Sequence, residues 1–245
     1  MLLEGKQAVI YGAGGSIGGA VARALAREGA DLHLTGRRSG PLAALAAEIR
    51  THGGTATRAT VDALDEAAID DHAAEVAASA GSIDISLNAI SHGELFGTPL
   101  AEISLADYER PVRTATRSTF LTARAAARHM IPRRSGVILT FGGYGRPLRD
   151  FYLGGFQVGL SAVDAFRRQL AAELGPYGIR VLTIQSVGIP ESHPSDGDGE
   201  STPLRLLERA PTLADVGNVA AFAASEQAAA ITGTAINITS GAEVD

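Results

Sequence analysis

The sequence predicts one α/β domain, a doubly wound parallel sheet of seven strands with helices on both faces. Three observations predict it. Short apolar runs alternate with longer helical segments along the whole chain, a glycine-rich turn follows the first apolar run, and no long linker or repeat interrupts the alternation. Repeated strand–helix units of this kind form parallel sheets. A chain of 245 residues can bury a sizeable core in one such domain.

Each element is expected where an apolar or periodic run lies between turn signals. Strands are expected at residues 8–11, 30–35, 56–61, 83–88, 136–141, 178–184 and 235–239. Helices are expected at residues 20–28, 41–50, 66–80, 106–131, 152–174 and 213–224. Pro111 should interrupt the fourth helix and Pro132 should end it, because proline lacks the amide donor of a helix interior. The polar segment at about 188–210 is predicted to be a loop or lid over the substrate.

The glycine-rich turn between the first strand and the first helix is the strongest functional signal. Five glycines lie within eight residues, at Gly12, Gly14, Gly15, Gly18 and Gly19. Backbone N–H groups at such a turn point at an anion, and glycine lets the anion come close. A tight turn that binds nothing is the alternative, but so many glycines cost much backbone entropy. We therefore expect a cofactor's phosphates to be bound here, by Gly12, Gly14, Gly15, Ser16, Ile17 and Gly18.

Two arginines, Arg37 and Arg38, directly follow the second predicted strand. An acidic residue at this place would hold the ribose 2′-hydroxyl of NAD, whereas an arginine accommodates the 2′-phosphate of NADP. Two solvated surface arginines are the alternative interpretation. Because the pair lies one strand–helix unit beyond the glycine turn, we predict NADP(H) as the cofactor.

Composition excludes several classes of function. The net charge of −6 argues against nucleic acid or an anionic membrane as the main partner. The absence of cysteine excludes disulfides and thiolate nucleophiles. The first residues lack a signal-peptide layout, and no uncharged stretch is long enough for a membrane span, so we expect a cytoplasmic protein. Of 21 basic residues only Lys6 is a lysine. No histidine/carboxylate grouping has ligand spacing, so no metal site is predicted.

Together these stretches resemble the short-chain dehydrogenase/reductase family, which has a Rossmann-type fold, and the resemblance covers nearly the whole chain. The run Gly12-Ala-Gly-Gly-Ser-Ile-Gly18 is similar to the family's TGxxxGIG turn, with Tyr11 in place of threonine and Ser16 in place of the middle glycine. Asp62-Ala63 resembles its adenine-contacting Asp-Val pair, and Leu87-Asn88-Ala89-Ile90 resembles its NNAG motif. The resemblance implies cofactor contacts at Asp62, Ala63, Asn88 and Ile189. Ile189 lies in the stretch 186–191, which corresponds to the family's PGxxxT loop, although proline and threonine are both replaced.

The positions of the family's catalytic residues hold other residue types. The resemblance implies an asparagine, a serine, a tyrosine and a lysine at positions 115, 143, 156 and 160. The chain has Ala115, Gly143, Phe156 and Leu160 at these positions. None of these side chains can transfer a proton, donate a hydrogen bond or carry a charge. A shifted alignment does not restore the usual pair, because the chain has no lysine beyond position 6.

Other side chains near the expected substrate end could act instead. The candidates for a catalytic role are His92, Tyr144 and Tyr152, each a titratable group or a hydrogen-bond donor. Tyr152, at the start of the predicted helix 152–174, would lie one helical turn before Phe156 and project toward the same side. Further candidates in the neighbouring loops are Arg146, Arg149, Glu191 and His193. A surface or packing role is the alternative for each, and His33, His52, His72 and His129 are interpreted as structural or solvated.

Three functions remain open at this point. The first is a divergent NADP(H)-dependent oxidoreductase that transfers a hydride to a small molecule through a C=N, activated C=C or C=O bond. The second is a non-redox enzyme, such as an isomerase, cyclase or lyase, that reuses the same site. The third is an inactive NADP-binding or assembly protein. The family resemblance also implies a homodimer or homotetramer, formed through the long alanine-rich helices at 106–131 and 152–174.

Overall fold

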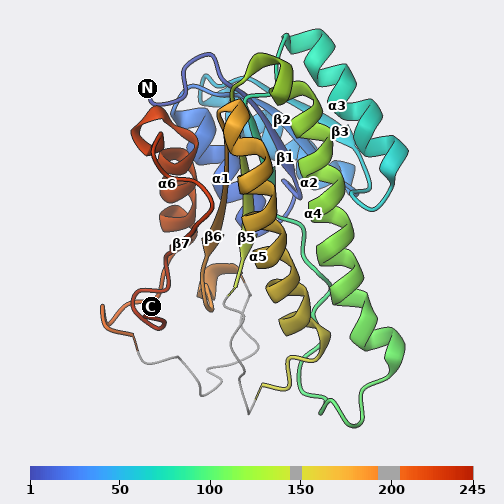
Figure 1. Ribbon diagram of the computed structural model, residues 1–245. Helices are drawn as coiled ribbons and strands as arrows, with labels where there is room; N and C mark the ends of the chain where they lie inside the picture. Colours follow the sequence, from blue (N-terminus) through green and yellow to red (C-terminus); the bar gives the residue numbers. More distant parts are fainter. Residues whose placement is uncertain (144–150, 193–204, 245) are drawn as a thin grey trace.

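The computed structural model describes residues 1–143, 151–192 and 205–244 and centres on a parallel sheet in the order β3-β2-β1-β4-β5-β6-β7 (Figure 1). The strands are β1 (Gln7–Tyr11), β2 (Asp31–Gly36), β3 (Ala56–Thr60), β4 (Ile85–Asn88), β5 (Gly136–Gly142), β6 (Ile179–Gln185) and β7 (Ala235–Asn237). The helices are α1 (Ser16–Arg27), α2 (Ser39–Thr51), α3 (Glu66–Ala80), α4 (Leu105–Arg133), α5 (Gly155–Leu174) and α6 (Leu213–Ala224). The predicted seven-stranded, doubly wound α/β fold is confirmed.

The apolar core is divided by the sheet into two layers. On one face, α1, α2 and α6 bury side chains such as Leu25, Leu42 and Val216 against the strands. On the other face, α3, α4 and α5 bury side chains such as Ile69 and Met130. Strands covered on both faces are nearly continuous apolar runs, which is why the sequence pattern locates them well.

The point where the strand order reverses lies between β1 and β4. β1 pairs with β2 on one side and with β4 on the other, and the chain then builds outward in both directions. Ligands of doubly wound sheets bind at the carboxyl ends of the strands beside such a point. Here those ends carry the glycine turn after β1 and the loop after β4.

The first helix begins earlier than predicted. The helix expected at 20–28 begins at Ser16 with Gly15 as its N-cap, so Gly18 and Gly19 belong to the helix and not to the turn. Glycine has a low helix propensity, and for this reason the sequence pattern placed the start later. Both glycines are buried, and the tight packing at the start of α1 overrides the local preference.

The two long helices also differ from the prediction. The helix expected at 106–131 is the continuous α4. Pro111 does not interrupt this helix, and Pro132 does not end it, since both lie inside it. A Cβ on Gly159 of α5 would lie 3.2 Å from the Pro111 carbonyl oxygen, so the two helices pack closely at the proline and offset its missing hydrogen bond. The helix expected at 152–174 begins only at Gly155, because Gly154 has φ +52° and ψ −134°.

Because two histidines are buried, we predict that the free energy of unfolding falls on mild acidification. Burial lowers the pKa of His33 and the pKa of His72 below the ordinary value of 6.5, and the proximity of His33 adds to the effect on His72. The unfolded chain therefore binds more protons than the folded chain as the pH falls below about 6.5, and stability falls with it.

Replacing His72 by leucine should flatten this dependence. The Nδ1 atom of His72 has no hydrogen-bond partner, so the loss of the imidazole removes no bond at that atom. We expect the urea midpoint of the wild-type chain to fall between pH 7.5 and pH 5.5, and His72→Leu to show a smaller fall. His52→Gln, at an exposed position of α2's end, is the matched control and should behave as the wild type. Equal slopes for all three proteins would contradict the assignment.

Candidate functional site

The glycine turn after β1 is closely packed against the loop after β4. Gly12 has φ +84°, and a Cβ built on it would lie 2.6 Å from the carbonyl oxygen of Ala89. A Cβ on Gly18 would lie 2.3 Å from the carbonyl oxygen of Gly12. Only glycine fits at either position without moving backbone. The turn also bonds to β2, since the N–H groups of Gly12 and Ala13 donate to the Thr35 carbonyl at 3.1 and 3.0 Å.

The N-terminus of α1 is suited to an anion. Its N-cap, Gly15, provides no side-chain hydrogen bond, and the first turn holds no acidic residue. The first-turn N–H groups of Ser16, Ile17 and Gly18 have no partner further up the helix, and the helix dipole adds positive potential. Gly15 and Ser16 are exposed. The residues present therefore fit the phosphates of a nucleotide, as the sequence predicts.

The side chains predicted to contact the rest of the nucleotide lie along the carboxyl ends of β2, β3 and β4. Arg37 and Arg38 follow β2, and both are exposed. Asp62 follows β3 and is exposed, with its Oδ1 accepting a hydrogen bond from Leu64 N–H at 3.0 Å, while Ala63 is buried in the core. These positions are compatible with the predicted contacts, which stay predictions.

Asn88 lies at the end of β4 and is buried. Its Nδ2 donates to Ser118 Oγ and Thr122 Oγ1, each at 3.3 Å, and its Oδ1 accepts from Ile90 N–H at 3.0 Å. These bonds join the strand, the loop after it and α4. The side chain of Asn88 therefore positions the loop, and the amide atoms predicted to contact a cofactor already have protein partners.

Three of the four positions of the family's catalytic residues lie between α4, α5 and the end of β5. A Cβ on Gly143 would lie 3.3 Å from Leu160 Cδ1. Ala115 Cβ lies 3.2 Å from the Cβ position of Gly159, the neighbour of Leu160. Leu160 and Ala115 are buried. The structure thus places Ala115, Gly143 and Leu160 near one another, and none of these residues has a polar side-chain atom.

Phe156 belongs to a cluster of three rings, which we call the ring cluster: His92, Phe96 and Phe156. The ring centroid of Phe156 lies 5.9 Å from that of His92 and 5.8 Å from that of Phe96. His92 is 6% exposed, and its Nδ1 has no hydrogen-bond partner. Burial lowers the pKa of His92, and the nearby Glu94 carboxylate only partly opposes this. His92 is therefore neutral at neutral pH and able to donate one hydrogen bond.

Two other catalytic candidates are placed differently from the prediction. Tyr152 precedes α5, has φ +48° and is 45% exposed, so its predicted position at the helix start is wrong. The reason is the backbone turn at Gly154, which separates it from the helix. Glu191 accepts a hydrogen bond from Leu213 N–H at 2.6 Å, at the start of α6, so its carboxylate stabilises that helix end. Four further candidates lie outside the described residues: Tyr144, Arg146, Arg149 and His193.

The segment predicted as a lid at 188–210 is described only at its two ends. Ile189 is buried in the apolar core, so it fixes the loop after β6 to the body of the protein. Arg205 donates to the Gly188 carbonyl oxygen at 3.3 Å, and its Nε is buried without a partner. The residues between, 193–204, lie outside the described part. Sequence reasoning missed Arg205 because nothing in the spacing links it to Gly188.

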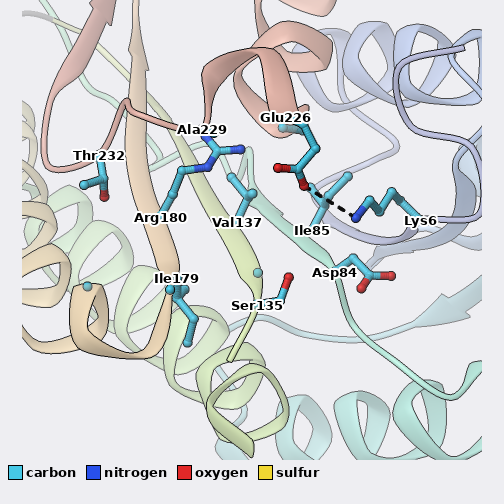
Figure 2. A pocket seen from close by; sticks show the side chains of 14 residues that line it. Lys6, Asp84, Ile85, Ser135, Val137, Ile179, Arg180, Glu226, Ala229 and Thr232 are labelled. Carbon is cyan, nitrogen blue, oxygen red and sulfur yellow. Dashed lines mark ion pairs between the residues drawn. The ribbon is translucent and has the colours of Figure 1, made fainter. Parts of the chain in front are cut away.

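A cavity of about 320 Å³ lies at the amino ends of β4, β5 and β6, the end of the sheet opposite the glycine turn (Figure 2). Lys6 points toward Glu226 there, with Nζ and Oε1 3.8 Å apart. Arg180 donates to the carbonyls of Ala223 and Ser225 at the C-terminal end of α6, where a cation is favourable. The fourth charged residue of the lining, Asp84, accepts hydrogen bonds from Gln7 N–H at 2.8 Å and Ser82 Oγ at 2.9 Å, so all four charges have partners. The single lysine lies at the end of the sheet away from the glycine turn.

Within the described residues, no group of three or more histidine, aspartate or glutamate side chains is arranged to hold a metal ion. Within the same ranges, no helix is both long and apolar enough to cross a membrane.

Comparison with known proteins identifies the class to which this fold and site belong. The model of the family described as enoyl-(acyl carrier protein) reductase matches residues 12–243. A D-threitol dehydrogenase from Mycolicibacterium smegmatis is 30% identical over 244 residues, which cover 98% of this chain and 93% of that one. The structure of a short-chain type dehydrogenase/reductase from Mycobacterium marinum has a TM-score of 0.92 at 27% identity, covering 99% of this chain and 97% of that one.

A further neighbour bears on the cofactor. A blue fluorescent protein from a metagenomic library, solved in complex with NADPH, has a TM-score of 0.88 at 27% identity and covers all of both chains. The fold and site define a dinucleotide-binding α/β protein. The chain belongs to the short-chain dehydrogenase/reductase family. The family assignment made from the sequence is thereby confirmed, and the neighbour supports the predicted nicotinamide cofactor.

Proposed function

We propose that the chain is an NADP(H)-dependent oxidoreductase that transfers a hydride to a small organic substrate without the family's tyrosine–lysine pair. The observation that carries this proposal is a contrast within one site. The glycine turn and the start of α1 fit a nucleotide's phosphates, whereas Gly143, Phe156 and Leu160 leave only hydrocarbon at the positions of the usual acid. The accepting bond is therefore one that needs little protonation in the transition state.

The residues of the cofactor half have distinct roles in this proposal. The first-turn amides of α1, with Gly12 and Gly18 allowing close approach, hold the diphosphate. Arg37 and Arg38 form charge-assisted hydrogen bonds with the 2′-phosphate, which NAD lacks. Asn88 keeps the loop after β4 in place through Ser118 and Thr122.

The residues of the substrate half orient the substrate and shield it from water. NADPH supplies the hydride when bound, so the protein's task is to align the acceptor and exclude water. The buried side chains of Ala115 and Leu160 provide an apolar wall. His92, neutral and buried, donates one hydrogen bond to the substrate's heteroatom as its electron density rises. A C=N or activated C=C bond suits this arrangement better than an unactivated ketone, because an imine that binds as the protonated iminium accepts the hydride directly, and the enolate formed from an enone takes its proton from water after the transfer.

A panel of acceptors tests the proposal. The loss of NADPH absorbance would be followed with cyclic imines, enones and plain ketones, each at neutral pH. We expect turnover of imines or enones and little turnover of plain ketones. Turnover of a substrate with no change in the NADPH redox state would instead establish a non-redox enzyme. Tight NADPH binding with no turnover of any member would favour an inactive binding protein, and either result would contradict the proposal.

Tyr152 should contribute little to catalysis. Its side chain is 45% exposed and lies outside α5, away from the position of the family's tyrosine. We therefore expect Tyr152→Phe to change kcat/KM with the best acceptor by less than about twofold, whereas loss of a general acid costs about 100-fold or more. A 100-fold loss with unchanged NADPH affinity would identify Tyr152 as the acid and refute the proposed mechanism.

A further inference from the structure

The substrate end of the site is unusually rich in aromatic rings. The whole chain has 12 phenylalanine and tyrosine residues, and four of them lie in two short described segments, 92–97 and 151–156. These four are Phe96, Phe151, Tyr152 and Phe156. A backbone hydrogen bond from Gly97 N–H to the Phe151 carbonyl at 3.2 Å joins the two segments. The two segments that carry one third of the chain's Phe and Tyr residues therefore meet where the loop after β4 passes the start of α5 (Figure 1), and the rings of Phe96 and Phe156 are in contact there.

Most of these rings are exposed, whereas the rings of a hydrophobic core are buried. Phe96 is 50% exposed, Phe151 43% and Tyr152 45%. Exposed apolar surface of this kind marks a binding site when it lies beside functional residues. Its place in the fold meets that condition, because the loop that carries His92 and Phe96 begins at Ala89, whose backbone contacts Gly12 of the phosphate-binding turn.

One polar atom within the ring cluster has no partner. His92 is only 6% exposed, and its buried Nδ1 atom makes no hydrogen bond with any described residue. A buried polar atom without a partner costs free energy, and such atoms in native proteins call for an explanation. A ligand that displaces part of the ring cluster and brings one polar atom to the imidazole supplies the missing hydrogen bond.

We propose that the ring cluster of His92, Phe96 and Phe156 binds an aromatic ring of the substrate, and that His92 hydrogen-bonds to the heteroatom of the neighbouring C=N or C=O group. Phe96 and Phe156 already meet edge to face, with an interplanar angle of 78°, so a third ring can add to the cluster in the same offset or edge-to-face geometry. The substrate class is thus an aryl-substituted imine or enone. The inference rests on the proposed function only in naming the bound molecule as the hydride acceptor.

Binding of two matched ketones tests the inference without turnover. Acetophenone and cyclohexyl methyl ketone have the same heavy-atom skeleton and one carbonyl oxygen each, but only the first has an aromatic ring. Their affinities would be measured by ligand-observed NMR with the full chain, both with saturating NADP⁺, which donates no hydride, and without nucleotide. We expect acetophenone to bind about 2- to 10-fold more tightly, as the energies of aromatic pairs imply.

Three variants separate the ring from the hydrogen bond. Phe96→Leu should bring the affinity ratio of the two ketones close to one. Phe120→Leu is the matched control, because Phe120 is 45% exposed and pairs with Phe166 on α4 and α5 outside the ring cluster, and it should leave the ratio unchanged. His92→Phe keeps a ring but removes the nitrogen, so it should weaken both ketones about 2- to 10-fold and preserve their ratio.

The outcomes distinguish this inference from the proposed function. Equal affinities of the two ketones in the wild-type chain would overturn the inference even if NADP⁺ binds. The same would follow if Phe96→Leu and Phe120→Leu had equal effects. A ring preference that persists in a chain that binds no nucleotide would support the ring site while refuting the proposed function. Because Phe96 is half-exposed, its replacement by leucine leaves the core intact, and circular dichroism checks this.

Discussion

Gly18→Ala is expected to abolish useful NADPH binding and to destabilise the fold. The added Cβ would lie 2.3 Å from the Gly12 carbonyl oxygen and 2.9 Å from Ala13 Cα, both backbone atoms that no side-chain rotation can move away. The phosphate-binding turn must open to accommodate it. We expect a loss of about 1–3 kcal/mol in the free energy of unfolding. The loss of two charge-assisted hydrogen bonds would reduce NADPH affinity by about 100-fold.

The next residue on the same helix provides the control. A Cβ on Gly19 would meet only Arg23 Nη1, at 3.1 Å, and Ala13 O, at 3.5 Å. The Arg23 guanidinium is the flexible end of a side chain and can shift, and alanine is a better helix former than glycine. Gly19→Ala should therefore keep NADPH binding and unfold at the same or a higher urea concentration. Equal effects of the two substitutions, measured by urea unfolding and nucleotide titration, would contradict the proposed role of the turn.

Replacing Arg37 and Arg38 together by alanine is expected to remove the preference for NADPH over NADH. Both side chains are exposed at the end of β2, so their removal leaves no cavity. Hydrogen bonds to charged groups contribute about 1.5–3 kcal/mol, which corresponds to about 10- to 100-fold in NADPH affinity. NADH, which lacks the 2′-phosphate, should bind within about twofold of wild type by the same reasoning.

Arg113→Ala, at an exposed position of α4, is the control for the loss of an exposed arginine; it removes one positive charge where the double variant removes two. Its NADPH affinity should equal that of the wild type at the same ionic strength. If the double variant keeps its preference for NADPH, or if Arg113→Ala loses as much affinity, the arginines after β2 do not read the 2′-phosphate.

Most of the sheet could be predicted from the sequence because its inner strands are short, buried apolar runs. β1 and β6 illustrate this, since nearly every residue of each is buried and the run ends at a turn signal. The edge strand β3 is an exception, since only Ala56 of its five residues is buried. Helix starts were less predictable. Gly18 and Pro111 have poor local propensities for the helices they occupy, and tertiary packing overrides them. Gly154 had the opposite effect, because its backbone conformation delays the start of α5 and moves Tyr152 out of the helix.

The site could be predicted where it depends on consecutive residues. The glycine turn and the arginines after β2 are each local in the sequence, and the turn bonds to the Thr35 carbonyl of β2, while their contacts with a nucleotide stay predictions. The ring cluster could not be predicted in this way, because Phe96 and Phe156 are 60 positions apart and their contact depends on how the loop after β4 meets α5. The unpartnered atoms of His92 and Gln157 are likewise invisible in a sequence, since they depend on what surrounds each side chain.

A parallel titration of the wild-type chain with NADPH and with NADH tests the central claim most directly. Isothermal titration calorimetry at fixed ionic strength gives both dissociation constants in one experiment. Saturable binding of NADPH, at least about tenfold tighter than that of NADH, is the predicted result, because one charge-assisted contact to the 2′-phosphate accounts for that factor. Binding of neither nucleotide, or tighter binding of NADH, would contradict the proposal that the glycine turn, Arg37 and Arg38 form an NADP(H) site.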